Sequence, residues 1–174
     1  KILKKLNLEK KNFYLLTLHR PDLVDDNSKL KKILKYFSSL ENFKTIFPIH
    51  PRTQSKIKKL SFYKQKNLIL INPCNYLDFL SLQKNAKLIF TDSGGVQEEA
   101  CILKTPCITI RKNTERPETI KIGSNILVDY SITKLNKAID KSLNTKLSWG
   151  NPYGKNVSKK IIRILKQDFL KNEI

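Results

Sequence analysis

The feature that most constrains the fold of this chain is a set of six short apolar runs separated by longer amphipathic segments. The runs lie at residues 13–18, 45–49, 68–71, 88–91, 107–110 and 125–128. Uninterrupted apolar runs of this length are typical of strands that are buried on both faces of a parallel sheet. The remaining segments predict helices at 27–39, 54–60, 76–84, 96–103, 133–143 and 157–171, with a short helical turn at 116–122. We therefore predict an α/β fold, a doubly wound parallel sheet of the Rossmann-like type.

Polar side chains follow four of these predicted strands. His19 comes after the first strand and His50 after the second. Ser93 follows the fourth strand and Arg116 the fifth. Because ligands of doubly wound folds bind beyond the carboxyl ends of the strands, we expect these side chains to line one binding site.

The fourth predicted strand passes into its helix through the turn Ser93-Gly94-Gly95. Glycines let the backbone approach a ligand closely, and a helix that begins there offers N–H groups and its positive dipole end to an anion. Glu99 follows Gly95 at helical spacing, so its carboxylate can accept hydrogen bonds from hydroxyls beside that anion. A phosphate on the turn and a sugar diol on the carboxylate together indicate a nucleotide-sugar site. Taken alone, the turn also fits a junction that only packs tightly.

The chain of 174 residues carries 34 Lys and Arg against 15 Asp and Glu, a net charge of +19. Such a surplus is found in proteins that bind nucleic acid or anionic membranes. The basic residues here are mostly lysines spread along the whole chain, so we interpret them as a solvated surface and predict that the chain binds neither. No apolar run is long enough to span a bilayer, and residues 1–12 lack a signal-peptide core.

Cys74, Cys101 and Cys107 form an odd set with no CxxC pair. This favours a reducing cytoplasmic environment and predicts neither a disulfide framework nor a zinc site. Cys101 and Cys107 stand in apolar contexts typical of small core residues, whereas Cys74 lies in a predicted strand-to-helix loop. The chain contains no methionine, so we expect it to be a piece of a longer protein.

Five motifs occur in a fixed order along the chain: TLHRP at 17–21, FPIHPRT at 47–53, TDSGGVQEEA at 91–100, NTERPE at 113–118 and NPYG at 151–154. This ordered set resembles the C-terminal half of the non-hydrolysing UDP-N-acetylglucosamine 2-epimerases. The resemblance covers about residues 13–170, nearly the whole chain. One departure from the family pattern is Lys104, which stands where a glycine usually ends the helix.

The resemblance implies a two-domain architecture of the glycosyltransferase-B (GT-B) type. Residues 1–12 would be a linker or helical lead-in, and residues 13–174 the C-terminal UDP-binding domain of a parent whose N-terminal domain is absent here. The implied reaction of the parent interconverts UDP-N-acetylglucosamine and UDP-N-acetylmannosamine by elimination and re-addition of UDP, in cytoplasmic synthesis of cell-surface polysaccharide and without cofactor or metal. The acid and base carboxylates would lie on the absent domain, so the fragment alone is expected to be inactive. The full-length parent is expected to be a homodimer.

The same resemblance gives roles to individual residues. His19 would stabilise the leaving diphosphate, the one catalytic contribution expected from this domain. Ser93, Gly94 and Gly95 would cradle the phosphate, and Glu99 would hold the ribose hydroxyls. The other implied substrate-binding residues are Phe79 beside the uracil, Cys74 through its main chain, and Arg116.

Several of these residues keep a second interpretation. At the end of a buried strand, His19 and Arg20 also fit structural hydrogen bonds, and we expect Arg20 to be structural. Phe79 also fits the core position of an amphipathic helix. Arg52 either pairs with a phosphate through its planar guanidinium, or caps local carbonyls or binds an acidic helix. His50 holds a similar position to His19, after the second predicted strand.

The acidic residues around Arg116 are expected to be structural. Pro117 suits the first position of a helix, which places Glu115 and Arg116 at the helix start. We expect Glu115 and Glu118 to be the salt-bridge partners that aim Arg116. Glu98 lies on another face of its helix and is interpreted as structural.

Four other functions compete with this one. The parent could be an epimerase for a related UDP-sugar such as a diacetamido-uronic acid, or a hydrolysing epimerase, which the turn at Ser93-Gly94-Gly95 disfavours. The chain could instead be a nucleotide-sugar-binding module without chemistry. Its charge also allows a nucleic-acid binder, which a salt-dependent gel shift would detect.

Overall fold

The computed structural model of the chain describes residues 1–60, 66–144 and 148–171. Within these residues, six parallel strands form one sheet in the order β3-β2-β1-β4-β5-β6. The strands are β1 (Phe13–Thr17), β2 (Lys44–Pro48), β3 (Leu68–Ile71), β4 (Leu88–Thr91), β5 (Cys107–Ile110) and β6 (Asn125–Val128). All six predicted strands are therefore confirmed, and so is the doubly wound Rossmann-like fold.

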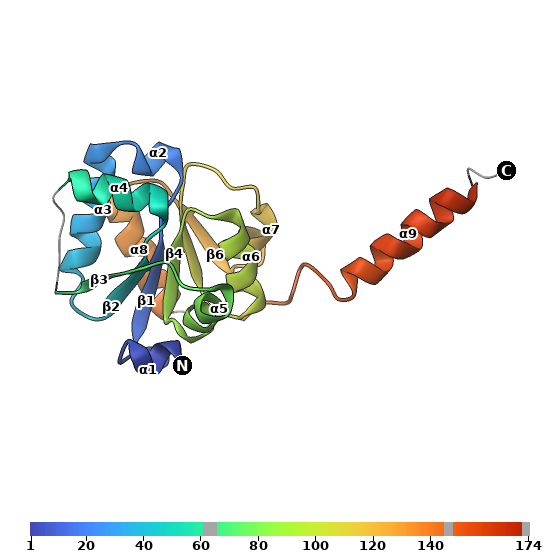
Figure 1. Cartoon of the computed structure of the whole chain (residues 1–174), viewed down its shortest axis with the longest axis horizontal. Helices are drawn as coiled ribbons and strands as arrows, with labels where there is room; N and C mark the ends of the chain where they lie inside the picture. Colours follow the sequence, from blue (N-terminus) through green and yellow to red (C-terminus); the bar gives the residue numbers. More distant parts are fainter. Residues whose placement is uncertain (61–65, 145–147, 172–174) are drawn as a thin grey trace.

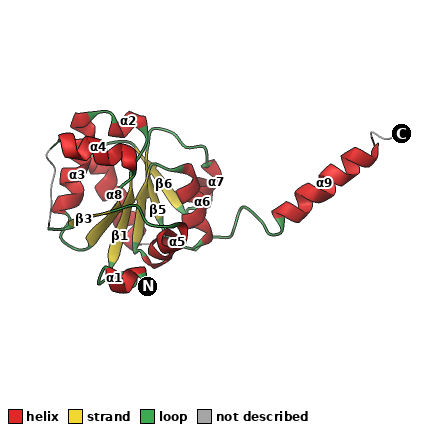
Figure 2. Ribbon diagram, in the orientation of Figure 1, coloured by secondary structure: helices red, strands yellow, loops and turns green. Residues whose placement is uncertain are grey.

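The helices alternate with the strands and lie on both faces of the sheet (Figures 1 and 2). They are α1 (Ile2–Lys5), α2 (Pro21–Val24), α3 (Asn27–Ser39), α4 (Pro51–Lys59), α5 (Tyr76–Asn85), α6 (Gly94–Ile102), α7 (Pro117–Lys121), α8 (Ile132–Asn144) and α9 (Val157–Lys171). The short helix α2 was not predicted. The start predicted for α4 at residue 54 was wrong, because Pro51 takes the first helical position behind His50.

Side chains that alternate along each strand divide the core into two layers. On one face, Tyr14 and Leu16 of β1 pack in a cluster with side chains of α3 and α8. On the other face, Phe13 and Leu15 pack in a cluster with side chains of α1, α5 and α6. Because both faces are covered, the strands are mostly apolar, which is why they were recognisable in the sequence.

The structure also describes the three cysteines and the turn at Lys104. Cys101 and Cys107 are buried, as expected of small core residues, and Cys74 is half-buried. Lys104, which follows α6, adopts the left-handed conformation with φ of 58°, the backbone geometry that a glycine usually supplies at a helix end. The lysine therefore keeps the turn that the family pattern makes with glycine.

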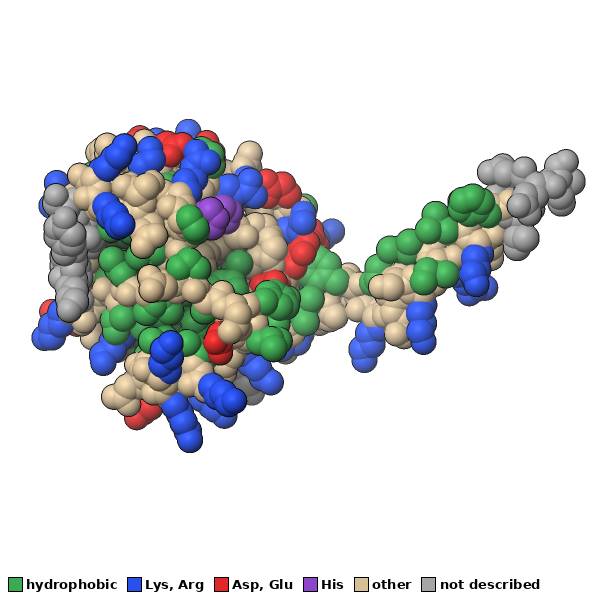
Figure 3. All heavy atoms as spheres, in the orientation of Figure 1, with side chains coloured by type: hydrophobic (Ala, Val, Ile, Leu, Met, Phe, Trp, Pro, Cys, Tyr) green, Lys and Arg blue, Asp and Glu red, His purple; other side chains and the backbone are tan. Residues whose placement is uncertain are grey.

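Helix α9 projects away from the body of the domain (Figure 1). Apolar side chains run along one of its sides and basic side chains along the other (Figure 3). The exposed apolar residues are Val157, Ile161, Ile162, Ile164, Leu165 and Phe169. An amphipathic helix of this kind usually buries its apolar side against another element. No helix in the described part of the chain is both long and apolar enough to cross a membrane.

Candidate functional site: a crevice at the strand ends

The order of the strands places a crevice between β1 and β4. The chain runs from β1 toward β2 on one side, whereas β4 lies on the other side of β1. At this switch point Thr17 and Thr91 are register partners at the carboxyl ends of the two strands, and their hydroxyl oxygens lie 2.6 Å apart. The loops that leave β1 and β4 diverge there, which is where doubly wound folds bind ligands.

Helix α6 begins at this crevice with Ser93 as its N-cap. The Ser93 N–H donates to the Thr91 hydroxyl at 3.0 Å, and the first backbone bond of the helix runs from Gln97 N–H to the Ser93 carbonyl. The N–H groups of Gly94, Gly95 and Val96 consequently have no partner inside the helix. These amides and the helix dipole form a site suited to an anion.

A pocket of about 220 Å³ adjoins the start of α6. Four of the predicted site residues, His19, Cys74, Phe79 and Ser93, line it together with His50. Its remaining lining residues are Thr17, Leu18, Pro48, Ile49, Pro51, Pro73 and Val96. Figure 3 shows a histidine side chain at the surface of the body above a stretch of apolar side chains. The pocket thus combines apolar walls with imidazole and hydroxyl groups.

Asp92 fixes His19 at the edge of this pocket. The Asp92 side chain is fully buried, and its Oδ2 accepts the main-chain N–H groups of His19 and Arg20 at 2.8 Å each. Its Oδ1 lies 3.0 Å from Nδ1 of His19. This contact favours the proton on Nδ1 and leaves Nε2 as the other nitrogen available to a ligand. Asp92 was not singled out in the sequence, although it directly precedes Ser93 and a carboxylate at a strand end needs a partner.

His50, the second histidine of the pocket, caps a helix. His50 is the N-cap of α4, and its Nδ1 accepts the N–H of Arg52 at 3.2 Å. The two imidazole rings of His19 and His50 lie 5.5 Å apart between centroids. Arg52 donates to Asp25 at 2.5 Å, so of its two interpretations the structure favours the acidic partner beside α2.

Two residues of helix α5 hold Glu99. Tyr76 donates its hydroxyl to Oε1 of Glu99 at 3.2 Å, and Gln83 donates its amide to Oε2 at 2.6 Å. The Glu99 carboxylate raises the pKa of Tyr76, which keeps that hydroxyl protonated as a donor. Gln83 is fully buried, so its bond fixes the position of the carboxylate against α5. Neither partner was predicted, because residues 76 and 83 come from another helix.

Arg116 is the N-cap of α7. It contacts α6 through Glu98, whereas Glu99 of the same helix contacts α5. The Arg116 Nε donates to Oε1 of Glu98. The prediction that Glu115 and Glu118 aim Arg116 was wrong. The Glu115 carboxylate forms two hydrogen bonds with Arg111, at 2.7 and 2.9 Å, and Glu118 accepts the hydroxyl of Tyr153 at 2.9 Å.

Charge is arranged unevenly around the site. Four arginines follow the strand ends here: Arg20, Arg52, Arg111 and Arg116. The Arg111 guanidinium lowers the pKa of Glu115 to about 2, so this carboxylate stays ionised. Its Oε2 lies 3.5 Å from the point that a Cβ on Gly94 would occupy.

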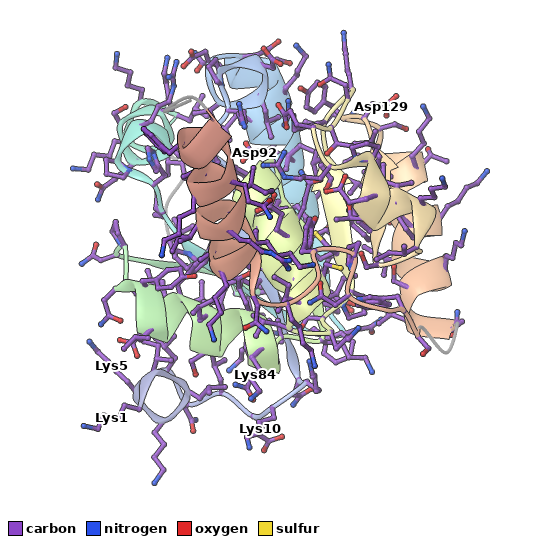
Figure 4. The ribbon with its side chains drawn as sticks, turned by 90° about the vertical axis from the view of Figure 1, so that its right-hand side faces the viewer. Lys1, Lys5, Lys10, Lys84, Asp92 and Asp129 are labelled. Carbon is purple, nitrogen blue, oxygen red and sulfur yellow. The ribbon has the colours of Figure 1, made fainter. Side chains whose placement is uncertain are left out.

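Figure 4 shows Asp92 and Asp129 toward one end of the body and Lys1, Lys5, Lys10 and Lys84 at the other end, so these lysines lie away from the crevice.

Cys74 does not have the surroundings of a nucleophile. Burial raises the pKa of its thiol, which opposes formation of the reactive thiolate. It lines the pocket next to Pro73 and Phe79. Contact with a ligand there would come from apolar surface and main chain.

Comparison with known proteins agrees with this geometry. A family profile described as UDP-N-acetylglucosamine 2-epimerase matches residues 1–166. The UDP-N-acetylglucosamine 2-epimerase of Methanocaldococcus jannaschii is 50% identical over 162 residues, which are 88% of this chain and 44% of that protein. A UDP-2,3-diacetamido-2,3-dideoxy-D-glucuronate 2-epimerase of Pseudomonas aeruginosa is 36% identical over 118 residues, 67% of this chain and 33% of that protein.

Solved structures show the same relationship. A crystal structure of the M. jannaschii enzyme in complex with UDP-GlcNAc and UDP superimposes with a TM-score of 0.86 at 46% identity, covering 95% of this chain and 48% of that one. The enzyme of Neisseria meningitidis bound to UDP-GlcNAc gives a TM-score of 0.80 at 28% identity, covering 95% and 48%. The chain therefore spans about half the length of these relatives. With its sheet, its strand-end motifs and its profile match in agreement, the chain belongs to the UDP-N-acetylglucosamine 2-epimerase family.

Proposed function

We propose that residues 13–174 are the C-terminal, UDP-binding domain of an enzyme that interconverts UDP-N-acetylglucosamine and UDP-N-acetylmannosamine, with residues 1–12 leading into it. The observation that carries this proposal is the start of α6 at the β1–β4 crevice, where the amides of Gly94, Gly95 and Val96 lack helical partners. A diphosphate is the part of UDP that such a site would bind. Family membership supports the same ligand, because relatives were crystallised with UDP and UDP-GlcNAc.

The orientation of UDP follows from what surrounds those amides. The apolar pocket beside Phe79 and Cys74 accommodates the uracil, and its walls bury a flat ring. Glu99, held by two donors of α5, accepts the ribose hydroxyls. The diphosphate then lies on the Ser93-Gly94-Gly95 turn between His19 and Arg116.

In the proposed reaction, a base removes the C2 proton of the sugar, the C1–oxygen bond breaks, and its electron pair leaves with UDP. Re-addition of UDP after the proton returns on the other face gives the epimer. This domain contributes stabilisation of the negative charge on the leaving diphosphate through helix amides and the Arg116 guanidinium, and through Nε2–H of His19 when both nitrogens of that imidazole carry a proton. Acid and base groups come from the other half of the parent, so we propose that this chain alone is inactive.

The other half is also the proposed partner of α9. The apolar side chains of α9 are 49–71% exposed, with Phe169 the most exposed. Relatives are about twice as long as this chain, which leaves room for an N-terminal domain. We further propose that the full-length parent is a cytoplasmic homodimer.

A second substrate is favoured by one specific relative. The 36% identity to a diacetamido-uronate epimerase supports a related UDP-sugar as an alternative. Both substrates share the UDP moiety, so the site argued above serves either. Comparing the two UDP-sugars in turnover by the full-length parent separates them.

Titration calorimetry of the purified chain with UDP tests the proposal. We expect weak binding that Glu99→Ala or Arg116→Ala weakens by about tenfold or more, since charge-assisted hydrogen bonds contribute about 1.5–3 kcal/mol each. Glu41→Ala and Arg163→Ala, at exposed positions away from the crevice, are the matched controls and should bind like wild type. Equal affinity in all five proteins would reject the site, and epimerase turnover by the 174-residue chain would reject the division of labour.

A further inference from the structure

A buried glutamine in the middle of α6 connects the two sides of the candidate site. Gln97 is fully buried, and its side chain forms three hydrogen bonds. Its Nε2 donates to the Ser93 carbonyl at 3.1 Å. Because a carbonyl can only accept, this bond fixes which end of the Gln97 amide faces the turn. The oxygen end therefore faces the loop that precedes α7.

One route runs from that oxygen to the main-chain N–H of Arg116. Thr114 donates its hydroxyl to Oε1 of Gln97 at 2.6 Å. The same hydroxyl oxygen accepts the N–H of Arg116 at 3.0 Å. Two hydrogen bonds thus connect Gln97 to the backbone of Arg116.

A second route reaches the carbonyl of Arg116. Asn125 of β6 donates one Nδ2 proton to Oε1 of Gln97 and the other to Oγ1 of Thr119, both at 3.1 Å. Thr119 donates its hydroxyl onward to the Arg116 carbonyl at 2.7 Å. Thr109 completes the network by donating to Oδ1 of Asn125 at 2.8 Å. Asn125, Thr109 and Thr119 are buried.

We propose that Gln97 is a positioning residue, which sets the distance between the Ser93-Gly94-Gly95 turn and Arg116 so that both hold the same phosphate group. The inference rests on the proposed function, since it presumes a diphosphate at this turn. Gln97 is connected to the Arg116 N–H through Thr114 and to the Arg116 carbonyl through Asn125 and Thr119; the Thr119 main-chain N–H also donates to that carbonyl, and Glu98 holds the Arg116 side chain separately. Loss of the bridge frees the loop although every ligand-binding group remains, and small misplacements of such groups are costly.

The variant Gln97→Met tests this role, because methionine has a similar shape and removes all three hydrogen bonds. Thr114→Val is the second variant, since Thr114 is half-buried and its loss breaks only the first route. Ile33→Val, which trims a fully buried side chain in α3, is the control for a general loss of stability. Affinities for UDP and for uridine are measured in each protein, because only UDP carries the diphosphate.

We expect Gln97→Met and Thr114→Val to lower the ratio of UDP affinity to uridine affinity by about tenfold, a change on the scale of one buried hydrogen bond. Ile33→Val should leave that ratio unchanged. A ratio that stays at the wild-type value in both bridge variants would overturn the proposal.

Amide hydrogen exchange gives a readout that needs no ligand. The Arg116 N–H should exchange faster in both bridge variants, whereas the Lys29 N–H, capped by Asp26 at the start of α3, should not change. If wild type fails to bind UDP, the proposed function fails, and the Arg116 exchange rate alone decides the role of Gln97. Unchanged Arg116 exchange in Gln97→Met would reject that role.

Discussion

Replacing Asp92 with asparagine should both destabilise the domain and change the tautomer of His19. The carboxylate receives three contacts: two main-chain N–H groups on Oδ2 and the His19 imidazole on Oδ1. An asparagine offers one oxygen and one amide nitrogen. If its oxygen keeps the two N–H groups, its nitrogen must donate to Nδ1 of His19, which moves the imidazole proton to Nε2. Flipping the amide would place its N–H groups against two main-chain donors and is less favourable.

The size of the effect follows from these contacts. Hydrogen bonds to a charged group contribute about 1.5–3 kcal/mol each, against about 1 kcal/mol for neutral ones. Weakening two of them predicts a loss of about 1–3 kcal/mol in the free energy of unfolding. The burial of Asp92 leaves no solvent to compensate.

Urea unfolding followed by the fluorescence of Trp149, the chain's single tryptophan, measures that loss. Nitrogen NMR of the His19 imidazole reports the tautomer. Asp25→Asn, at an exposed carboxylate with its own arginine partner, is the matched control and should unfold nearly as wild type does. An Asp92→Asn protein with wild-type stability and the proton still on Nδ1 would refute the reasoning.

Two further outcomes are expected. Arg111 lowers the pKa of Glu115 from 4.5 to about 2, so the folded state takes up this proton less readily than the unfolded chain. The ionised Glu115 therefore stabilises the folded state fully above pH 4.5, and this contribution is lost toward pH 2. The difference in unfolding free energy between wild type and Glu115→Gln should shrink as the pH falls through that window. A constant difference would contradict this. Gln83→Leu should lower the affinities for uridine and for UDP by similar factors, because the Glu99 carboxylate loses its buried donor. Calorimetry that finds uridine binding unchanged would exclude this role of Gln83.

The strands were predictable because a sheet covered on both faces favours apolar side chains at most positions. The starts of the helices were harder to predict than the strands. His50 caps α4 through its imidazole, and Pro21 begins the single turn of α2; both lie in motifs that the sequence presents as loops. Local propensity cannot identify a cap whose acceptor is a histidine rather than Ser, Thr, Asp or Asn.

The sequence predicted residues that the structure brings together at the strand ends, but not the partners that hold them. Four of the predicted site residues line one pocket: His19 and Ser93 belong to the ordered motifs, whereas Cys74 and Phe79 lie between those motifs. The ion pair of Arg116 with Glu98 joins two helices, so sequence proximity favoured Glu115 and Glu118 instead. Gln97 and Asp92 stand inside a recognised motif, yet their roles depend on tertiary contacts that spacing does not encode.

The most direct test of the central claim is nitrogen–proton NMR of the labelled chain titrated with UDP. Binding of the diphosphate at the start of α6 predicts that the largest amide shifts fall on Gly94, Gly95 and Val96, the amides without helical partners. Uridine should move resonances around Phe79 while leaving these three largely in place. Amides of Gly94 and Gly95 that stay unmoved at saturating UDP, with shifts clustered elsewhere, would contradict the account.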